Sequence, residues 1–296
     1  MNLGGTVLKI GIVADVFKDP NFKILKETAK ILEELGVEVV YPDTRAQHRV
    51  NRSSEVQDSW NACDLAISIG GDGTFLYTCS EIYGLDIPLI GVNRGSFGFL
   101  TEIDANHLST ALLKLVKGQY IIEQRMMLEV KVFDATDNVL YTSYGLNDAV
   151  LYRGDISRII PCVLKINGSY IQTVSSDGII IAGPSGSTGY AMSCGGPIVD
   201  PGLNLMQITP ISPHSLQART YVVSPGETIE VSIKEDYLYE PMLSVDGKEG
   251  IKINNSNRIE VKKAPKYMLL ASISQDGFFK NLPEKLNARG IRDESK

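Results

Sequence analysis

An aspartate set among glycines, directly after an apolar run, is the first feature of the sequence that could do chemistry. Residues 67–84 read ISIGGDGTFLYTCSEIYG, with Asp72 as the acid in the turn. The pattern predicts a strand, a turn and a helix. A turn after a parallel strand lies at the edge where open α/β sheets bind ligands. The segment is therefore a candidate site.

The small residues around the aspartate suit a phosphate. We expect Gly70, Gly71 and Gly73 to bring the backbone close to a ligand and to take positive φ. We expect Thr74 to begin a helix, whose free N–H groups favour anions. These residues predict a phosphate-binding turn.

The negative charge of Asp72 needs a separate explanation, because it would repel a phosphate. A magnesium ion between the two would remove that conflict, and so would a role in accepting a proton from an attacking hydroxyl. Both describe phosphoryl transfer. The alternative is a helix-starting acid, which the helix dipole stabilises by roughly 0.3–1 kcal/mol. The sequence contains no G-x-x-x-x-G-K-[ST] loop and no G-x-G-x-x-G after its first strand, which excludes an ordinary P-loop or Rossmann assignment.

A second glycine-rich stretch covers residues 177–201, DGIIIAGPSGSTGYAMSCGGPIVDP. It offers many N–H and hydroxyl donors, few bulky side chains, and one aromatic face, Tyr190, for a base or ribose. The alternative is an extended turn at a domain boundary. We interpret the stretch as a second binding segment.

Several of these segments resemble known families. The G-G-D-G-T sequence resembles the superfamily that contains NAD kinases, diacylglycerol-type lipid kinases and 6-phosphofructokinases, and it does not choose among them. Residues 177–201 resemble the NAD kinase pattern D-G-x-I-x-x-T-P-x-G-S-T-A-Y-x-x-S-x-G-G-P-I, which lipid kinases lack. Residues 91–103, 145–151 and 208–219 resemble three further NAD kinase segments. The sequence is identified as a member of the NAD kinase family.

Three positions depart from the family pattern. Asp148 stands where Glu is usual, Gly183 where Thr is usual, and Gly189 where Ala is usual. The aspartate keeps the charge but withdraws it by one methylene. None of the three affects Asp72, so we expect altered affinity or preference and not a loss of activity.

The resemblance implies a reaction and a set of roles. The terminal phosphoryl group of ATP passes to the 2′-hydroxyl of the adenosine ribose of NAD, giving NADP, and whether inorganic polyphosphate also serves as donor stays open. Asp72 is the expected general base. Gly71, Gly73 and Thr74 are expected to hold the donor phosphates together with Mg²⁺ or another divalent cation.

The same resemblance implies an NAD site. Asp177 is expected at the adenine end, with Phe99 and Leu100 as apolar neighbours, and Tyr190 as a stacking surface worth about 1–3 kcal/mol by analogy with nucleic-acid bases. Asp246 is either a site acid or an ordinary Asp-Gly hairpin turn. The remaining expected contacts are Asn147, Asp148, Ser185, Thr188, Gly189 and Ser193.

The elements that must position these residues form two patterns. Strands alternating with helices over residues 1–118 predict a doubly wound α/β domain carrying the G-G-D-G-T turn. Residues 119–270 read as short strands separated by Gly, Pro and Asn, which predicts an antiparallel β-sandwich-like domain for NAD binding and oligomerisation. Asn167-Gly168 is a strong hairpin signal. Residues 271–296 are expected to pack back on the N-terminal domain. The predicted fold class is α/β plus all-β.

Composition narrows the remaining possibilities. The 296-residue chain has a formal net charge of -6, which argues against a nucleic-acid binder. No membrane span, secretion signal or zinc-ligand spacing is present, so we expect a cytoplasmic protein without a membrane partner. The family resemblance implies a homo-oligomer, a dimer or a tetramer. The competing hypotheses are a related lipid or sugar kinase and a non-catalytic NAD(P)-binding regulator.

Overall fold

The chain divides into two compact units. Residues 1–124 with 268–296 form the first unit, and residues 125–267 form the second. The computed structural model describes residues 7–15, 17–42, 59–93, 98–154, 158–215, 217–274 and 277–290, with side chains to 287 in the last range. Parts of two family-like segments, residues 94–97 and Leu216, lie outside the described residues.

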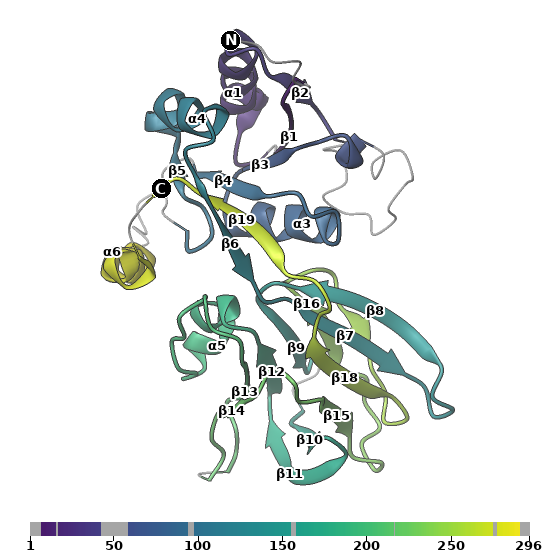
Figure 1. Ribbon diagram of the computed structural model, residues 1–296. Coiled ribbons are helices and arrows are strands. Elements are labelled where there is room, and N and C mark those ends of the chain that lie inside the picture. The colour runs from purple at the N-terminus through teal and green to yellow at the C-terminus, as the bar shows by residue number, and fades with distance from the viewer. Residues whose placement is uncertain are drawn as a thin grey trace. The chain divides into compact units, whose positions relative to one another are not determined.

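The first unit is built on one sheet with the strand order β2-β1-β3-β4-β19-β6, and β5 pairs with β4. β1 pairs in parallel with β2 and β3, and β4 pairs in parallel with β3, β5 and β19. In Figure 1 the yellow β19 lies beside β4, although it comes from the C-terminal part of the chain. The strands are β1 (Lys9–Ala14), β2 (Glu38–Val40), β3 (Leu65–Ile69), β4 (Leu89–Asn93), β5 (Ile103–Asp104), β6 (Ile121–Arg125) and β19 (Met268–Ser272).

Helices cover the central strands of this sheet, which explains why β1, β3 and β4 are buried on both faces. α1 (Lys23–Glu34) and α4 (Leu108–Val116) share one core with Ile90 and Val92 of β4. Gly91 points to the opposite face, where a Cβ would lie 2.9 Å from the ring of Phe75 in α3 (Asp72–Ile82). Short 3-10 turns, Pro20–Phe22 and Ala105–His107, precede α1 and α4, and α6 (Phe278–Gly290) ends the described chain.

The second unit contains two antiparallel six-stranded sheets. Their orders are β11-β10-β15-β18-β7-β8 and β14-β13-β12-β9-β16-β17. Alternate residues of both sheets form one core, which includes Val130, Leu164, Ile181 and Ile259. The strands are β7 (Leu128–Phe133), β8 (Val139–Gly145), β9 (Asp148–Tyr152), β10 (Ile160–Ile166), β11 (Ser169–Ser176), β12 (Gly178–Ala182), β13 (Met206–Ile211), β14 (Tyr221–Val223), β15 (Ile229–Ile233), β16 (Met242–Val245), β17 (Ile251–Lys252) and β18 (Arg258–Lys263).

The predicted fold class is confirmed, and so is the predicted hairpin. Asn167 and Gly168 connect β10 to β11 with φ of 51° and 75°, as a tight two-residue turn requires. On the outer face of the β9–β12–β13 sheet lie the 3-10 turn Ser185–Thr188 and the short helix α5 (Tyr190–Ser193), where Ala191 packs on Val150 and Ile180. Among the described residues, no helix is long and apolar enough to cross a membrane.

Candidate active site

The turn that carries Asp72 follows β3 directly. Gly70 has a φ of +158°, and a Cβ there would lie 2.4 Å from Oγ1 of Thr74, so only glycine fits. Gly71 has a φ of -103°, and Gly73 does not have a positive φ either. The expectation of positive φ is therefore wrong for these two glycines.

The helix also begins earlier than expected. Its first residue is Asp72, with Gly71 at the N-cap, so the carboxylate sits at the positive end of α3. A Cβ on Gly71 or Gly73 would meet no atom within 4 Å among the described residues. Thr74 is buried, and its hydroxyl donates to Oδ2 of Asp15, which follows β1, at 3.4 Å. Open space and the start of a helix, whose first N–H groups have no partner within the helix itself, thus lie beside the acid.

Asp72 is held by a segment well ahead in the chain. Its Oδ2 accepts the N–H of Phe99, and its Oδ1 accepts the N–H of Leu100, both at 3.1 Å. Gly98 makes this approach possible, because a Cβ there would lie 2.0 Å from Oδ1 of Asp72. Phe99 and Leu100 were expected as apolar neighbours of adenine. The structure places their backbone amides on the proposed base.

The C-terminal segment supports residues 98–102. Oε1 of Glu102 accepts the N–H groups of Ile273 and Ser274 at 2.7 and 2.6 Å, and burial raises the pKa of its carboxyl. Nζ of Lys285 in α6 donates to the carbonyl of Phe99 at 3.3 Å and lies 6.0 Å from the centre of its ring. Sequence reasoning missed Glu102 and Lys285, because neither stands in a motif with Asp72.

In the second unit, the turn before β9 meets the loop after β12. The carbonyl of Asn147 accepts the N–H of Gly183 at 2.9 Å. A Cβ on Gly186 would lie 2.0 Å from the same carbonyl, so the two backbones touch. A Cβ on Gly189 would lie 3.1 Å from the Gly186 carbonyl and 3.4 Å from Oδ2 of Asp148. The glycine at 189 thus relieves a tight contact beside Asp148.

Asp148 is a buried acid whose pKa is far from its ordinary value. It is 6% exposed, and burial followed by the charge of Asp246 raises the pKa of its carboxyl to about 7, while the backbone N–H of Tyr190 opposes the shift. A carboxyl with such a pKa can exchange a proton near neutral pH. A ligand donor at Asp148 would favour the charged form.

Two buried polar atoms in this region lack a hydrogen-bond partner within the described part of the chain. They are Oδ1 of Asn147 and Oγ of Ser185. Buried polar atoms are normally paired, so unpaired ones in these two loop segments are candidates for ligand contacts. Thr188 is buried and donates to the Ser185 carbonyl at 3.2 Å, whereas Ser193 is exposed.

Tyr190 and Asp177 complete the predicted set. Tyr190 is 46% exposed, as an aromatic surface for stacking must be. Asp177 precedes β12, at the opposite end of that strand from Ser185, and its Oδ1 accepts from Nη1 of Arg153 at 2.9 Å. Its charge still reaches Tyr190: burial, Cys194 and then Asp177 raise the pKa of the phenol.

Asp246 lies beside the Asn147–Asp148 turn. It occupies a hairpin corner after β16 with a φ of 52°, followed by Gly247 at 69°. Its carboxylate accepts backbone N–H groups from Leu146, Asn147 and Asp148. The structure shows the hairpin turn and the contact with residues 146–148, and a place near an NAD site stays a prediction.

Comparisons with known proteins agree over both units. The model of the ATP-NAD kinase N-terminal domain matches residues 10–120, and that of the C-terminal domain matches residues 146–273. An NAD kinase of Caldanaerobacter subterraneus subsp. tengcongensis is 37% identical over 284 residues, covering 95% of this chain and 99% of the relative. An NAD kinase of Nitrosomonas europaea is 36% identical, covering 93% of each chain.

Two solved structures show the same fold. Yeast NADH kinase complexed with NADH has a TM-score of 0.84 at 23% identity, covering 99% of this chain and 90% of that one. An NAD kinase from Archaeoglobus fulgidus in complex with ATP has a TM-score of 0.75 at 25% identity, covering 95% of this chain and 99% of that one.

Proposed function

Since the chain belongs to the NAD kinase family, we propose that Asp72 is the general base with which it phosphorylates NAD to NADP. The 2′-oxygen of the adenosine ribose forms a bond to the terminal phosphorus of ATP, the bond from that phosphorus to its bridging oxygen breaks, and the hydroxyl proton passes to Asp72. One observation carries this role: the carboxylate stands at a helix start, fixed by two backbone N–H donors and flanked by open glycines.

Fixing the base is the main contribution that these contacts make. Phosphoryl transfer depends on positioning and charge stabilisation. The N–H groups of Phe99 and Leu100 hold both oxygens of Asp72, so the carboxylate keeps one orientation when the substrate arrives. Proton transfer to a positioned base contributes roughly 10² to 10⁴ in rate.

The donor phosphates belong at the start of α3, where Gly71, Gly73 and Thr74 provide N–H groups and space. Within the described residues no group of three His, Cys, Asp or Glu side chains forms a metal site. That fits magnesium, which keeps several waters and binds through substrate phosphates with one or two carboxylates. Asp72 and Asp15, which follow β3 and β1, are the carboxylates that would contact it. When bound, magnesium neutralises charge on the transferring phosphates.

NAD belongs on the second glycine-rich loop. Asn147, Asp148 and Ser185 are the proposed polar contacts, because they hold the perturbed carboxyl and the unpaired buried oxygens. Tyr190 is the proposed stacking surface. We propose the remaining contacts as follows. Thr188, Gly189 and Ser193 line the loop, Asp177 lies at the adenine end, and Phe99 and Leu100 are apolar neighbours of the adenine.

We also propose a role for each larger part of the chain. Residues 1–118 carry the donor site, residues 119–270 bind NAD and make oligomer contacts, and residues 271–296 support the first of these. We propose a homo-oligomer that acts in the cytoplasm on ATP and NAD, without a nucleic-acid or membrane partner.

The test is NADP formation by the purified full chain with NAD, ATP and Mg²⁺, read by an NADP-specific dehydrogenase. Polyphosphate replaces ATP, and NADH replaces NAD, in parallel reactions. Product with magnesium and ATP is the expected result. NAD binding without product would contradict the proposal and favour a regulator, and absence of NAD binding would favour a lipid or sugar kinase.

A further inference from the structure

We infer that Asp246 is a positioning residue: it fixes the Asn147–Asp148 turn through the backbone, in place of the direct NAD contact expected from the sequence. The inference rests on the proposed function, since it assigns the NAD site to that turn. It concerns how the second unit shapes the site before any ligand binds.

The contacts of Asp246 are the first argument. Its Oδ2 accepts the N–H of Leu146 at 2.7 Å, and its Oδ1 accepts those of Asn147 and Asp148 at 2.8 and 3.1 Å. In return, the N–H of Asp246 donates to the carbonyl of Asp148 at 3.0 Å. Three successive N–H groups that converge on one carboxylate form an anion-binding nest. The anion in this nest is supplied by the chain itself.

The place of the nest in the fold is the second argument. Gly145 is the last residue of β8 and pairs with Leu128 in one sheet, whereas Asp148 begins β9 and pairs with Ala182 in the other. Leu146 and Asn147 are therefore the crossover between the two sheets of this unit. A crossover has no strand partner for its N–H groups, and buried unpaired N–H groups are costly. Asp246 satisfies them and thereby sets the direction in which the Asn147 and Asp148 side chains leave the backbone.

The hairpin explains how Asp246 reaches the nest. β16 pairs with β9, with Val245 opposite Ala149, so the residue after β16 arrives beside the start of β9. The positive φ of Asp246 and Gly247 turns the chain sharply at that point. A Cβ on Gly145 would lie 2.7 Å from Val245 and 3.1 Å from Oδ1 of Asp246, so the two segments are in close contact.

Charge gives the inference a second readout. Burial raises the pKa of Asp246, while its three N–H donors and Lys248 oppose the shift. The charge of Asp246 in turn helps to raise the pKa of Asp148, on which the N–H of Tyr190 acts in the opposite direction. Removing the charge at Asp246 should therefore lower the pKa of Asp148.

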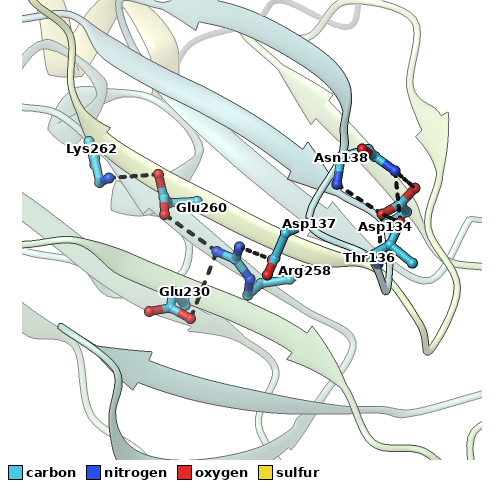
Figure 2. A network of polar contacts seen from close by, with 8 residues as sticks. All are labelled: Asp134, Thr136, Asp137, Asn138, Glu230, Arg258, Glu260 and Lys262. Atoms are coloured by element: carbon cyan, nitrogen blue, oxygen red, sulfur yellow. Dashed lines mark hydrogen bonds and ion pairs between the residues drawn. The ribbon is translucent and has the colours of Figure 1, made fainter.

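A second turn of the same unit provides a matched control. Asp134, in the turn from β7 to β8, accepts the N–H groups of Thr136 and Asn138 at 2.8 and 2.9 Å (Figure 2). Among the described residues its hydrogen-bond partners lie within residues 134–138, and the Arg258 network that Figure 2 also shows is reached through Asp137 and not through Asp134. Asp134 fixes only its own hairpin, so it lacks the link to the Asn147–Asp148 turn.

The experiment compares Asp246→Ala, Asp246→Asn and Asp134→Ala in the full chain. For Asp246→Ala we expect KM for NAD to rise about 10- to 100-fold, from loss of charged hydrogen bonds, with little change in KM for ATP. Asp246→Asn keeps one acceptor oxygen but turns an amide donor toward Leu146, so its KM should rise less. Asp134→Ala should keep the wild-type KM for NAD, whatever its effect on melting temperature.

Two further measurements keep the result decisive. Calorimetric titration of NAD without ATP measures affinity in each variant even if turnover is absent, so failure of the proposed reaction and failure of this inference are distinguishable. In Asp246→Asn, the pKa seen in the pH profile of NAD affinity should shift to lower pH. An unchanged NAD affinity in a folded Asp246 variant overturns the inference, and so does a loss of kcat with KM intact.

Discussion

Each unit of the molecule has an Asp-Gly turn whose carboxylate binds the backbone of a distant segment. Asp72 accepts two N–H groups from residues 27 and 28 positions ahead, and Asp246 accepts three from residues 98 to 100 positions behind. Asp72 begins a helix, whereas Asp246 turns a hairpin. The same side chain thus performs the same local task in two unrelated folds.

The surroundings of the two turns differ, and the difference suits a catalytic role for Asp72 and a positioning role for Asp246. Beside Asp72, a Cβ on Gly71 or Gly73 would find no atom within 4 Å among the described residues. Asp246 lies instead next to a second buried acid, Asp148, and its contacts are to backbone that the fold must satisfy in any case. Space next to a fixed carboxylate suits a substrate, and a filled nest suits a positioning role.

Replacing Asp72 should have the largest effect on kcat. If it had none, the contrast between a catalytic Asp72 and a positioning Asp246 would not hold. Asp72→Asn keeps the size of the side chain but cannot accept the hydroxyl proton, so kcat should fall by roughly 10² to 10⁴. NAD affinity should stay near wild type. This split between kcat and KM is the opposite of the one expected for Asp246. Steady-state kinetics with calorimetric NAD binding measures it, and turnover near wild type would remove Asp72 from the role of base.

The second prediction concerns the space that lets Asp72 reach its N–H donors. Gly98→Ala would put a Cβ 2.0 Å from Oδ1 of Asp72, so the carboxylate must move. Small misplacements of a reacting group can cost about 100-fold, and we expect kcat to fall by about 10- to 100-fold.

The control for that substitution is Gly226→Ala, because the nearest atom to a Cβ there is 3.9 Å away and the residue lacks a positive φ. Both variants are compared by kcat and by melting temperature. If Gly98→Ala folds and turns over like Gly226→Ala, the contact between Asp72 and residues 98–100 is not needed for the reaction.

The fold could be predicted well from the sequence because its signals are local. The strand, turn and helix predicted in residues 67–84 and the Asn167-Gly168 turn depend on neighbouring residues, and the structure has β3, α3 and the hairpin. The Asn147–Asp148 pair and the loop after β12 also meet, as a shared site requires.

The contacts that hold the site residues in place could not be predicted, because they join residues far apart in the sequence that share no regular spacing. Nothing local marks Gly98 as the residue that admits Asp72, or Glu102 as the acceptor for Ile273 and Ser274. The positive φ expected at Gly71 was wrong because a glycine pattern does not distinguish conformation from space.

The last prediction concerns the neighbouring acids Asp148 and Asp246, and it has the smallest expected effect. The pKa of Asp148 is about 7 in the folded chain against an ordinary 3.8. At pH values between the two, the folded state holds a proton that the unfolded state releases, so the stability contributed by this group is lost as pH rises toward 7. Asp148→Asn has no proton to lose, and it also removes the repulsion of Asp246. Relative to wild type, the free energy of unfolding of the variant should therefore increase by on the order of 1–2 kcal/mol as the pH rises from 5 to 8.

Thermal or denaturant unfolding of both proteins across that pH range measures this gain, and Asp134→Asn is the control with the opposite shift. Burial raises the pKa of Asp148, whereas hydrogen bonds from Asn138 and Thr136 lower the pKa of Asp134 to about 2. The contribution of Asp134 is present above its ordinary pKa and is lost only as pH falls through the acid range, so its variant should differ from wild type by a constant amount between pH 5 and pH 8. A pH-independent difference for Asp148→Asn as well would mean that Asp148 is ionised throughout. Asp148 and Asp246 would then both be charged across this pH range. The difference between the surroundings of Asp246 and Asp72 would then lie only in the backbone N–H groups that fill the Asp246 nest.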